Sequence, residues 1–182
     1  MKNKIKKLTF FLLLNIFILT NVIAQEINFE ANSIELKDND KRIIAKNNVK
    51  IFNEKEVIYA DEMDYNKLNQ IITAKGNIRI ENLEENIKVF SDELTYIKNE
   101  EKIILNKNVK IDFGKKLTFN TDKIVYDKIE KQILINNFSN FTDNFGNKII
   151  SKSSHYSFNQ KLLKINSVEM TDTINNKYYF QN

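Results

Sequence analysis

The sequence predicts an all-β protein in which a pair of strands is repeated about every 30 residues. Two observations carry this prediction. A short pattern of a small residue, polar residues and alternating apolar residues begins at Ala31, Ala60, Ser91, Thr121 and Ser151. A second segment of strictly alternating apolar and polar residues follows in each of the early copies, and a period of two indicates half-buried strands. Single units cannot bury an apolar face, so we expect them to stack around one continuous core, open at both ends.

Residues 1–24 have the parts of a secretory signal peptide: lysines near the start, an apolar run from Leu8 to Leu19, and small or aliphatic residues before Gln25. We therefore expect cleavage between Ala24 and Gln25, which leaves residues 25–182 as one soluble domain. The apolar run is short for a spanning helix, which needs ~20 residues. An uncleaved membrane anchor is the alternative.

Composition excludes several classes of protein and site. Of the 28 basic residues, four are lysines of the leader, which has no acidic residue, so the rest of the chain balances its 24 acidic residues. This balance removes the electrostatic reason to expect nucleic acid as a partner. Cysteine is absent, which excludes disulfides and thiolate metal sites. Proline is also absent and glycine is rare, so most of the chain is expected to be ordered.

The second segment of the unit gives the clearest strands. Its copies are residues 43–51, 72–80 and 103–111, and in each the apolar side chains fall on one face. Polar residues such as 37–41, 66–69 and 98–101 separate the strands and are typical of tight turns.

The first segment also alternates, but its phase slips by one residue. Ile58 and Ala60 precede Met63 and Tyr65, so two apolar phases are separated by an extra position. Such a slip sends later side chains to the opposite face unless a β-bulge or corner absorbs it. We therefore expect a bend in every unit, at the aspartates Asp61, Asp92 and Asp122.

The fourth and fifth units are less regular. Ser139 interrupts the apolar phase between Phe138 and Phe141, and a longer loop is expected around residues 143–147. The tyrosines Tyr65, Tyr96, Tyr126 and Tyr156 recur at one position of the unit and are interpreted as a cross-strand ladder.

No catalytic or metal-binding pattern accompanies these strands. His155 is the single histidine, and neither a zinc motif nor a nucleophile elbow surrounds it, so we interpret it as an outward-facing strand residue. The aspartates Asp61, Asp92 and Asp122 are interpreted as caps of the bends, because stacked calcium repeats are short and glycine-rich. We predict no enzyme activity, no cofactor and no metal.

The unit Ala60-Asp61-x-Met63-x-Tyr65, a turn, then Ile72-x-Ala74-x-Gly76-Asn77-Ile78-x-Ile80 resembles the repeat of the OstA-like family. That family includes the periplasmic lipopolysaccharide bridge LptA and the N-terminal domain of the outer-membrane assembly protein LptD. The resemblance spans residues 27–172 and is strongest from Phe29 to Ile111. It implies an antiparallel β-jellyroll, open at both ends, whose interior holds the acyl chains of lipopolysaccharide.

The resemblance also implies a set of inward-facing residues that line the lipid groove. Carried over by position, they are Phe29, Ala31, Ile58, Ala60, Met63, Ile72, Ala74, Ile78, Val89, Leu94, Ile103, Phe119 and Ile124. The fourth and fifth units depart from the glycine-asparagine form of the repeat, so the assignments there follow the pattern less closely.

The function implied is non-catalytic binding of lipopolysaccharide in the periplasm and its transfer toward the outer membrane. The implied partners are lipopolysaccharide and other OstA-like jellyrolls, joined by pairing of end strands, with head-to-tail self-association. Two alternatives stay open: the N-terminal periplasmic domain of the outer-membrane assembly protein without its barrel, and a β-solenoid that acts as an adhesion or structural scaffold. The same aliphatic residues would also form a filled core in an ordinary β-sandwich.

Overall fold

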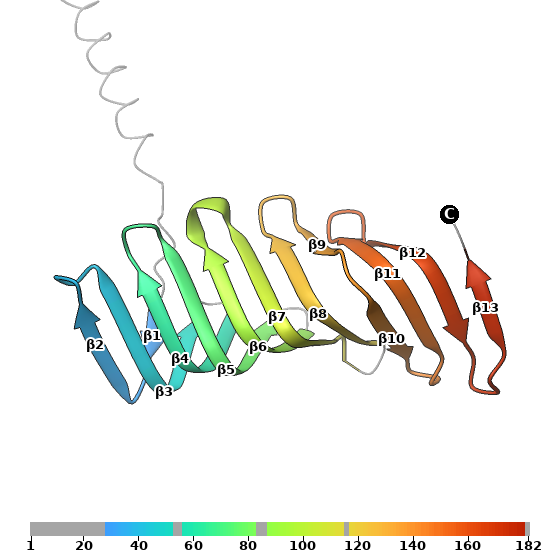
Figure 1. Ribbon diagram of the computed structural model, residues 1–182, viewed down its shortest axis with the longest axis horizontal. Helices are drawn as coiled ribbons and strands as arrows, with labels where there is room; N and C mark the ends of the chain where they lie inside the picture. Colours follow the sequence, from blue (N-terminus) through green and yellow to red (C-terminus); the bar gives the residue numbers. More distant parts are fainter. Residues whose placement is uncertain (1–27, 53–55, 83–86, 115–116, 181–182) are drawn as a thin grey trace, which may run out of the picture.

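The computed structural model describes residues 28–52, 56–82, 87–114 and 117–180, so the expected leader and its cleavage site at Ala24 and Gln25 lie outside the described residues. All described strands belong to one antiparallel sheet of 13 strands. Neighbours in the sheet are almost everywhere neighbours in the chain, and Figure 1 shows the strands stacked side by side from β2 to β13. The all-β antiparallel prediction is confirmed.

The described elements are β1 (Asn28–Glu30), β2 (Ser33–Lys37), β3 (Arg42–Phe52), β4 (Glu56–Asn66), β5 (Ile71–Asn82), β6 (Ile87–Ile97), the 3-10 turn η1 (Lys98–Glu100), β7 (Lys102–Asp112), β8 (Leu117–Asp127), β9 (Gln132–Ile135), β10 (Ser139–Asp143), β11 (Lys148–Ser157), β12 (Leu162–Thr171) and β13 (Lys177–Phe180). Two pairs act as broken long strands. β1 and β2 cover the two halves of β3, and β9 and β10 together lie between β8 and β11. No helix among the described residues is long and apolar enough to span a membrane.

Each long strand bends near its middle, where the pairing register shifts. The residues Asn47 and Asn48 of β3 lie opposite the single residue Asp61 of β4, and the same arrangement recurs opposite Asp92 and Asp122. The bend therefore lies at the position within each unit that the sequence predicted. The left-handed residues of the bulge belong to the second-segment strands: Asn47, Asn48, Gly76, Asn77, Lys107 and Asn108 all have positive φ.

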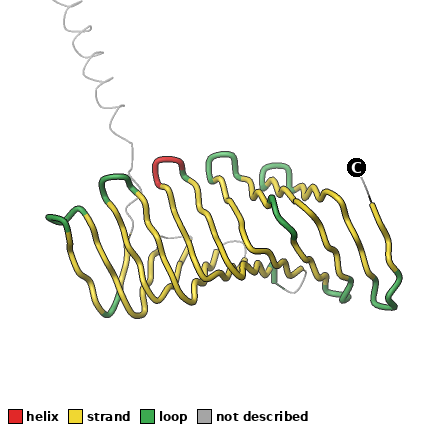
Figure 2. The backbone as a smooth tube through the Cα atoms, viewed as in Figure 1, coloured by secondary structure: helices red, strands yellow, loops and turns green. Residues whose placement is uncertain are grey.

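The bends fold the single sheet into two layers, and the strands of the N-terminal half turn back along the lower edge of Figure 2. We call the strand halves that adjoin the turns 38–41, 67–70, 98–101, 128–131 and 158–161 the first layer, and the other halves the second layer. Apolar side chains from both layers form one buried cluster between them. Among the described residues, the strands alone therefore enclose this core.

The inward side chains lie in rows that run across the strands. One row of the first layer alternates isoleucine and tyrosine: Ile43, Tyr65, Ile72, Tyr96, Ile103, Tyr126, Ile133 and Tyr156 are successive cross-strand partners. The four tyrosines thus share one row as expected, but an isoleucine separates each from the next. Aromatic and β-branched neighbours stabilise a sheet through such cross-strand contacts.

The turns of the first layer form a continuous rim, seen along the top of Figure 1. Each turn after the first donates one backbone hydrogen bond to the preceding turn. The N–H of Lys67 donates to the carbonyl of Lys41 at 2.9 Å, and that of Lys128 to the carbonyl of Glu101 at 2.9 Å. Side chains also hydrogen-bond to backbone N–H groups of the turns. The Asp127 carboxylate accepts the N–H groups of Ile129 and Glu130, as short polar side chains do at turn starts.

Candidate functional site

The thirteen residues predicted to face inward do so. Nine are buried: Ala60, Met63, Ile72, Ala74, Ile78, Leu94, Ile103, Phe119 and Ile124. The other four, Phe29, Ala31, Ile58 and Val89, are half-buried and pack against the same cluster. Their placement agrees with the expected pattern of alternation, and their role as a lipid site stays a prediction.

A cavity of about 350 Å³ lies between the two layers in the central units. It is lined by Glu56, Ile80, Ile87, Val89, Ile103, Leu105, Ile111, Phe113, Ile124, Tyr126, Lys131, Ile133 and Phe158. Apart from two charged side chains, this lining is aliphatic or aromatic. A cavity of this kind suits an apolar ligand, and its volume is at the lower end of the usual range for ligand sites.

Three of the predicted residues line the cavity: Val89, Ile103 and Ile124. The remaining predicted residues lie outside its lining; Met63 and Ile72, for instance, are packed with only 2% of their surface exposed. Around Met63 and Ile72 the interior is thus filled by the protein's own side chains. The cavity lies farther along the stack.

Sequence reasoning missed several residues that line the cavity, and three of them lie at strand ends. Ile87 begins β6, Phe113 follows the end of β7, and Phe158 follows the end of β11. All three lie at strand ends, beyond the regular core of the repeat. The one signal in the sequence was the alternation of Tyr156 and Phe158, which continues the inward phase of β11 by one more step.

Aromatic side chains close the cavity toward the C-terminal units. The ring of Phe113, from the second layer, lies 6.5 Å from the ring of Tyr156, from the first layer, in an edge-to-face arrangement. Tyr156 contacts Phe158 at 4.8 Å, and Phe158 contacts Tyr126 at 5.6 Å. These separations are those of favourable aromatic pairs. The four rings connect the two layers at one end of the cavity.

Polar groups gather where the first-layer rim approaches the cavity. The Tyr96 hydroxyl donates a 2.8 Å hydrogen bond to Glu101 Oε2, and the ammonium of Lys128 lies 3.7 Å from the same carboxylate. Burial, and then the hydrogen bond to Glu101, raise the pKa of Tyr96 well above its usual value. Glu56 and Lys131 are the charged residues of the cavity lining.

Buried hydroxyls occupy the corner between the layers in the C-terminal half. Ser139 Oγ and Ser151 Oγ are 2.7 Å apart, and Thr121 Oγ1 donates to the carbonyl of Phe138 at 3.0 Å. The single histidine does not take part in these hydrogen bonds: His155 Nε2 lies 2.8 Å from Gln132 Oε1 instead. His155 pairs with Leu134 in the outward phase between inward Ser154 and Tyr156, as expected for a strand residue on the outer face.

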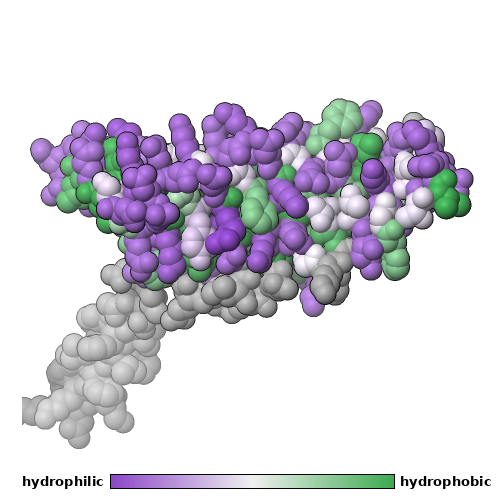
Figure 3. Space-filling model, turned by 90° about the horizontal axis from the view of Figure 1, so that it is seen from below, coloured by the Kyte–Doolittle hydropathy of each residue, from purple (hydrophilic) through white to green (hydrophobic). Residues whose placement is uncertain are grey.

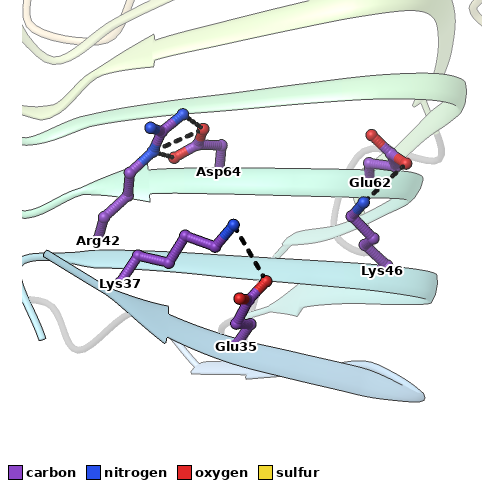
Figure 4. A network of polar contacts seen from close by, with 6 residues as sticks. All are labelled: Glu35, Lys37, Arg42, Lys46, Glu62 and Asp64. Carbon is purple, nitrogen blue, oxygen red and sulfur yellow. Dashed lines mark hydrogen bonds and ion pairs between the residues drawn. The ribbon is translucent and has the colours of Figure 1, made fainter.

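The outer surface is largely hydrophilic in the view of Figure 3, and the strands carry solvated ion pairs on it. Figure 4 shows Lys37 paired with Glu35, Lys46 with Glu62, and the guanidinium of Arg42 against the carboxylate of Asp64. Exposed pairs contribute little to stability. The aspartates of the bends are also partnered: Asp61 accepts the Asn77 amide at 2.8 Å, and Asp92 accepts that of Asn108 at 2.7 Å.

The geometry of the chain is thus a repeated, bent sheet with an apolar interior and a cavity inside it. Comparison with known families supplies the identity of that repeat, because the OstA-like protein family matches residues 20–181. The chain belongs to the OstA-like family. No curated protein matches the sequence of this OstA-like chain.

Solved structures share the fold of this OstA-like protein, and 19 chains match it. One is LptH from Pseudomonas aeruginosa, described as the LptA-homologous periplasmic component of the conserved lipopolysaccharide transport device. The two chains are 21% identical with a TM-score of 0.50, and the match covers 57% of this chain and 76% of LptH. At that identity the likeness establishes the fold, which confirms the predicted β-jellyroll.

Proposed function

We propose that this OstA-like protein binds acyl chains of lipopolysaccharide between its two layers and transfers the lipid through the periplasm toward the outer membrane, without catalysis. The observation that carries the proposal is the apolar cavity of about 350 Å³ inside a bent sheet of this family. The role that LptH has in lipopolysaccharide transport supports it by analogy of fold. We also propose that residues 1–24 are the leader and residues 25–182 the exported domain.

The energetics of acyl chains explain why such an interior is needed. Burial of each methylene is favourable by ~0.8 kcal/mol, so transfer of a chain of about twelve carbons into water costs roughly 9 kcal/mol of free energy. An apolar interior removes that barrier. A cavity of about 350 Å³ is small for a lipid with several chains, so we propose that the layers separate further when the lipid is bound.

End strands offer the surfaces through which neighbouring jellyrolls would join. β2 pairs only with β3 among the described residues, and its Ile34 and Leu36 are 50% and 55% exposed. At the other end, β13 pairs with residues 168–171 of β12, which leaves residues 162–166 of β12 paired only with β11 in that described part. Free strand edges add further strands readily. We propose head-to-tail pairing of β2 with this free half of β12.

The inward rows are in register for such a junction. Leu36 of β2 lies opposite Ile43 and so ends the isoleucine-tyrosine row at one side. Ile34 lies opposite Ala45, which pairs with Met63, and so ends a second inward row of the first layer. Leu163 and Ile165 of β12 lie opposite Tyr156 and Ser154 and end the rows at the other side. Pairing of β2 of one molecule with β12 of the next would therefore align the inward apolar rows of the two molecules. The apolar interior would then be continuous across the junction.

Native mass spectrometry of residues 25–182, purified from the periplasm of a lipopolysaccharide-producing host, tests the proposal over a range of protein concentrations. Bound lipid with a growing oligomer ladder is expected of a bridge. Lipid on a strict monomer would instead favour a docking domain of an assembly protein, and a protein without lipid and without a ladder would contradict lipid transport.

A cavity-filling variant shows whether the bound lipid uses the interior. Val89→Trp places an indole in the cavity, whereas Val125→Trp changes the outward side chain between Ile124 and Tyr126. We expect Val89→Trp to abolish lipid binding while Val125→Trp keeps it, with both variants folded by circular dichroism. Equal lipid binding by the two folded variants would show that the cavity is not the site.

A further inference from the structure

The cavity opens to solvent beside Lys131, which is an exposed residue of its lining, and we call this opening the mouth. Its two charged lining residues are Glu56, at the start of β4 in the second layer, and Lys131, in the rim turn 128–131 of the first layer. Glu56 has an interaction partner of its own. The Lys131 ammonium, by contrast, makes no ion pair or side-chain hydrogen bond with any described residue, whereas Lys128 of the same turn is paired with Glu101. Within the described part of the chain, a cation without an ion-pair partner therefore borders an apolar cavity.

The backbone of Lys131 is fixed in place. Its carbonyl accepts the N–H of Phe158 at 3.0 Å, which ties the turn to the next one along the rim. The Asp127 carboxylate holds the start of the same turn through the N–H groups of Ile129 and Glu130, at 3.0 and 2.9 Å. The side chain of Lys131, unlike its backbone, is free to change its conformation. A flexible ammonium on a rigid base reaches a ligand group at little cost in backbone entropy.

The fold does not require a lysine at this position. The final residue of the rim turn has positive φ in several units, namely Gln70 (55°), Glu101 (49°), Lys131 (51°) and Lys161 (51°). The side chains differ in charge from unit to unit, so the turn accepts any of them. Of these four, Lys131 is the one that lines the cavity.

We propose that Lys131 binds an anionic group, phosphate or carboxylate, carried by an amphiphile whose apolar chain occupies the cavity. This inference rests on the proposed function, because it requires an acyl chain in the cavity. The apolar lining holds the chain, and the ammonium at the mouth selects the charge of the group attached to it. A charged group there stays at the edge of solvent, which avoids the cost of burying it.

The test compares three probes with the same chain length below their micelle concentrations: dodecyl phosphate, dodecanoate and dodecyl maltoside. Their affinities for residues 25–182 are measured by calorimetry, with Lys131→Gln and, as matched control, Lys161→Gln. We expect the native protein to bind the two anions about tenfold more tightly than the neutral probe, the preference that ~1.4 kcal/mol from one charge-assisted hydrogen bond gives. Lys131→Gln should remove that preference, and Lys161→Gln should retain it.

The outcomes separate this inference from the proposed function. Equal binding of all three probes by the native protein, or an anion preference that survives Lys131→Gln, overturns the role of Lys131 and leaves the apolar site intact. Failure of every probe to bind overturns both. A larger loss for dodecyl phosphate than for dodecanoate would identify phosphate as the preferred group, and the reverse order would identify carboxylate.

Discussion

The side-chain amide of Asn77 donates a 2.8 Å hydrogen bond to the carboxylate of Asp61, across the corner where β4 and β5 bend together. Asn108 and Asp92 repeat this relationship at 2.7 Å in the next unit. In both cases the asparagine has positive φ and follows a second left-handed residue. The carboxylate thus fixes the side chain of the bulge residue through a hydrogen bond. The bulge, and with it the bend of the sheet, recurs at the same position in successive units.

Gly76→Ala is expected to destabilise the protein at this corner. Gly76 has a φ of 74°, and an added Cβ would clash with Asp61 Oδ2. Because the left-handed conformation alone costs an alanine roughly 1–2 kcal/mol, the displaced carboxylate should bring the total to about 2 kcal/mol or more. Urea unfolding followed by circular dichroism measures the loss.

Gly146→Ala is the control for Gly76→Ala. Its φ is 91°, but the nearest atom to an added Cβ is Thr173 Cγ2 at 3.5 Å, an ordinary contact. This variant therefore measures backbone strain without a clash. If both alanine variants lose the same stability, the contact with Asp61 has no effect, and the explanation of the corner is wrong.

Much of this corner could be predicted from the sequence, because a slip in the period of two has few structural solutions. Ala60 and Met63 are both buried with Asp61 and Glu62 exposed between them, as the slip requires. The strand that bulges could not be inferred in the same way. Its left-handed residues include Lys107, and lysine gives no signal for that conformation in a sequence.

The inward set was predictable and the cavity was not. Alternation fixes which face a side chain occupies, and Met63 and Ile103, both expected to face inward, are buried. Whether a space remains beside them depends on the side chains of the opposite layer, which come from other strands. The rings of Phe113 and Phe158 line the cavity, and the layer that each one faces is set by the tertiary fold.

Asp64→Asn is expected to change the acid sensitivity of the protein slightly. Asp64 bonds the guanidinium of Arg42, including its Nε at 2.8 Å, and this bond lowers the pKa of Asp64 below its usual 3.8. A lowered pKa means that the pair stabilises the fold above pH 3.8 and loses that contribution as the pH falls through the folded-state pKa. Because the pair is partly exposed, the contribution should stay under about 1 kcal/mol.

Urea midpoints of native protein and Asp64→Asn, measured from pH 6 down to pH 3, check this expectation: the difference between the two proteins should shrink toward the acid end. Glu62→Gln is the matched control, since Glu62 forms an exposed 3.8 Å pair with Lys46 on the neighbouring strands. A difference for Asp64→Asn that is constant across the range would show that its ionisation is not linked to folding.

Tyr96 should titrate above the ordinary tyrosine pKa of about 10. Burial and the bond to Glu101 raise its pKa, and a raised pKa means that its contribution to stability is present below the ordinary tyrosine pKa of about 10 and is lost as the pH rises through the folded-state value. Ultraviolet difference spectra of the chain, which has seven tyrosines, should show a late ionising group that is missing in Tyr96→Phe. Tyr179→Phe, at a 66% exposed residue, should leave that late group in place.

Phe113→Ala is expected to lengthen the cavity, because the Phe113 ring joins the second layer to Tyr156 of the first layer at 6.5 Å. Loss of a half-buried ring should cost roughly 1–3 kcal/mol. Space toward the C-terminal units would then open to a longer chain, so the variant should bind hexadecyl maltoside more tightly relative to dodecyl maltoside than the native protein does. Phe145→Ala, at a 75% exposed ring, should change neither stability nor chain preference. An unchanged preference in a folded Phe113→Ala protein would mean that chains leave the cavity by another route, and the aromatic contact would then serve only to hold the two layers together.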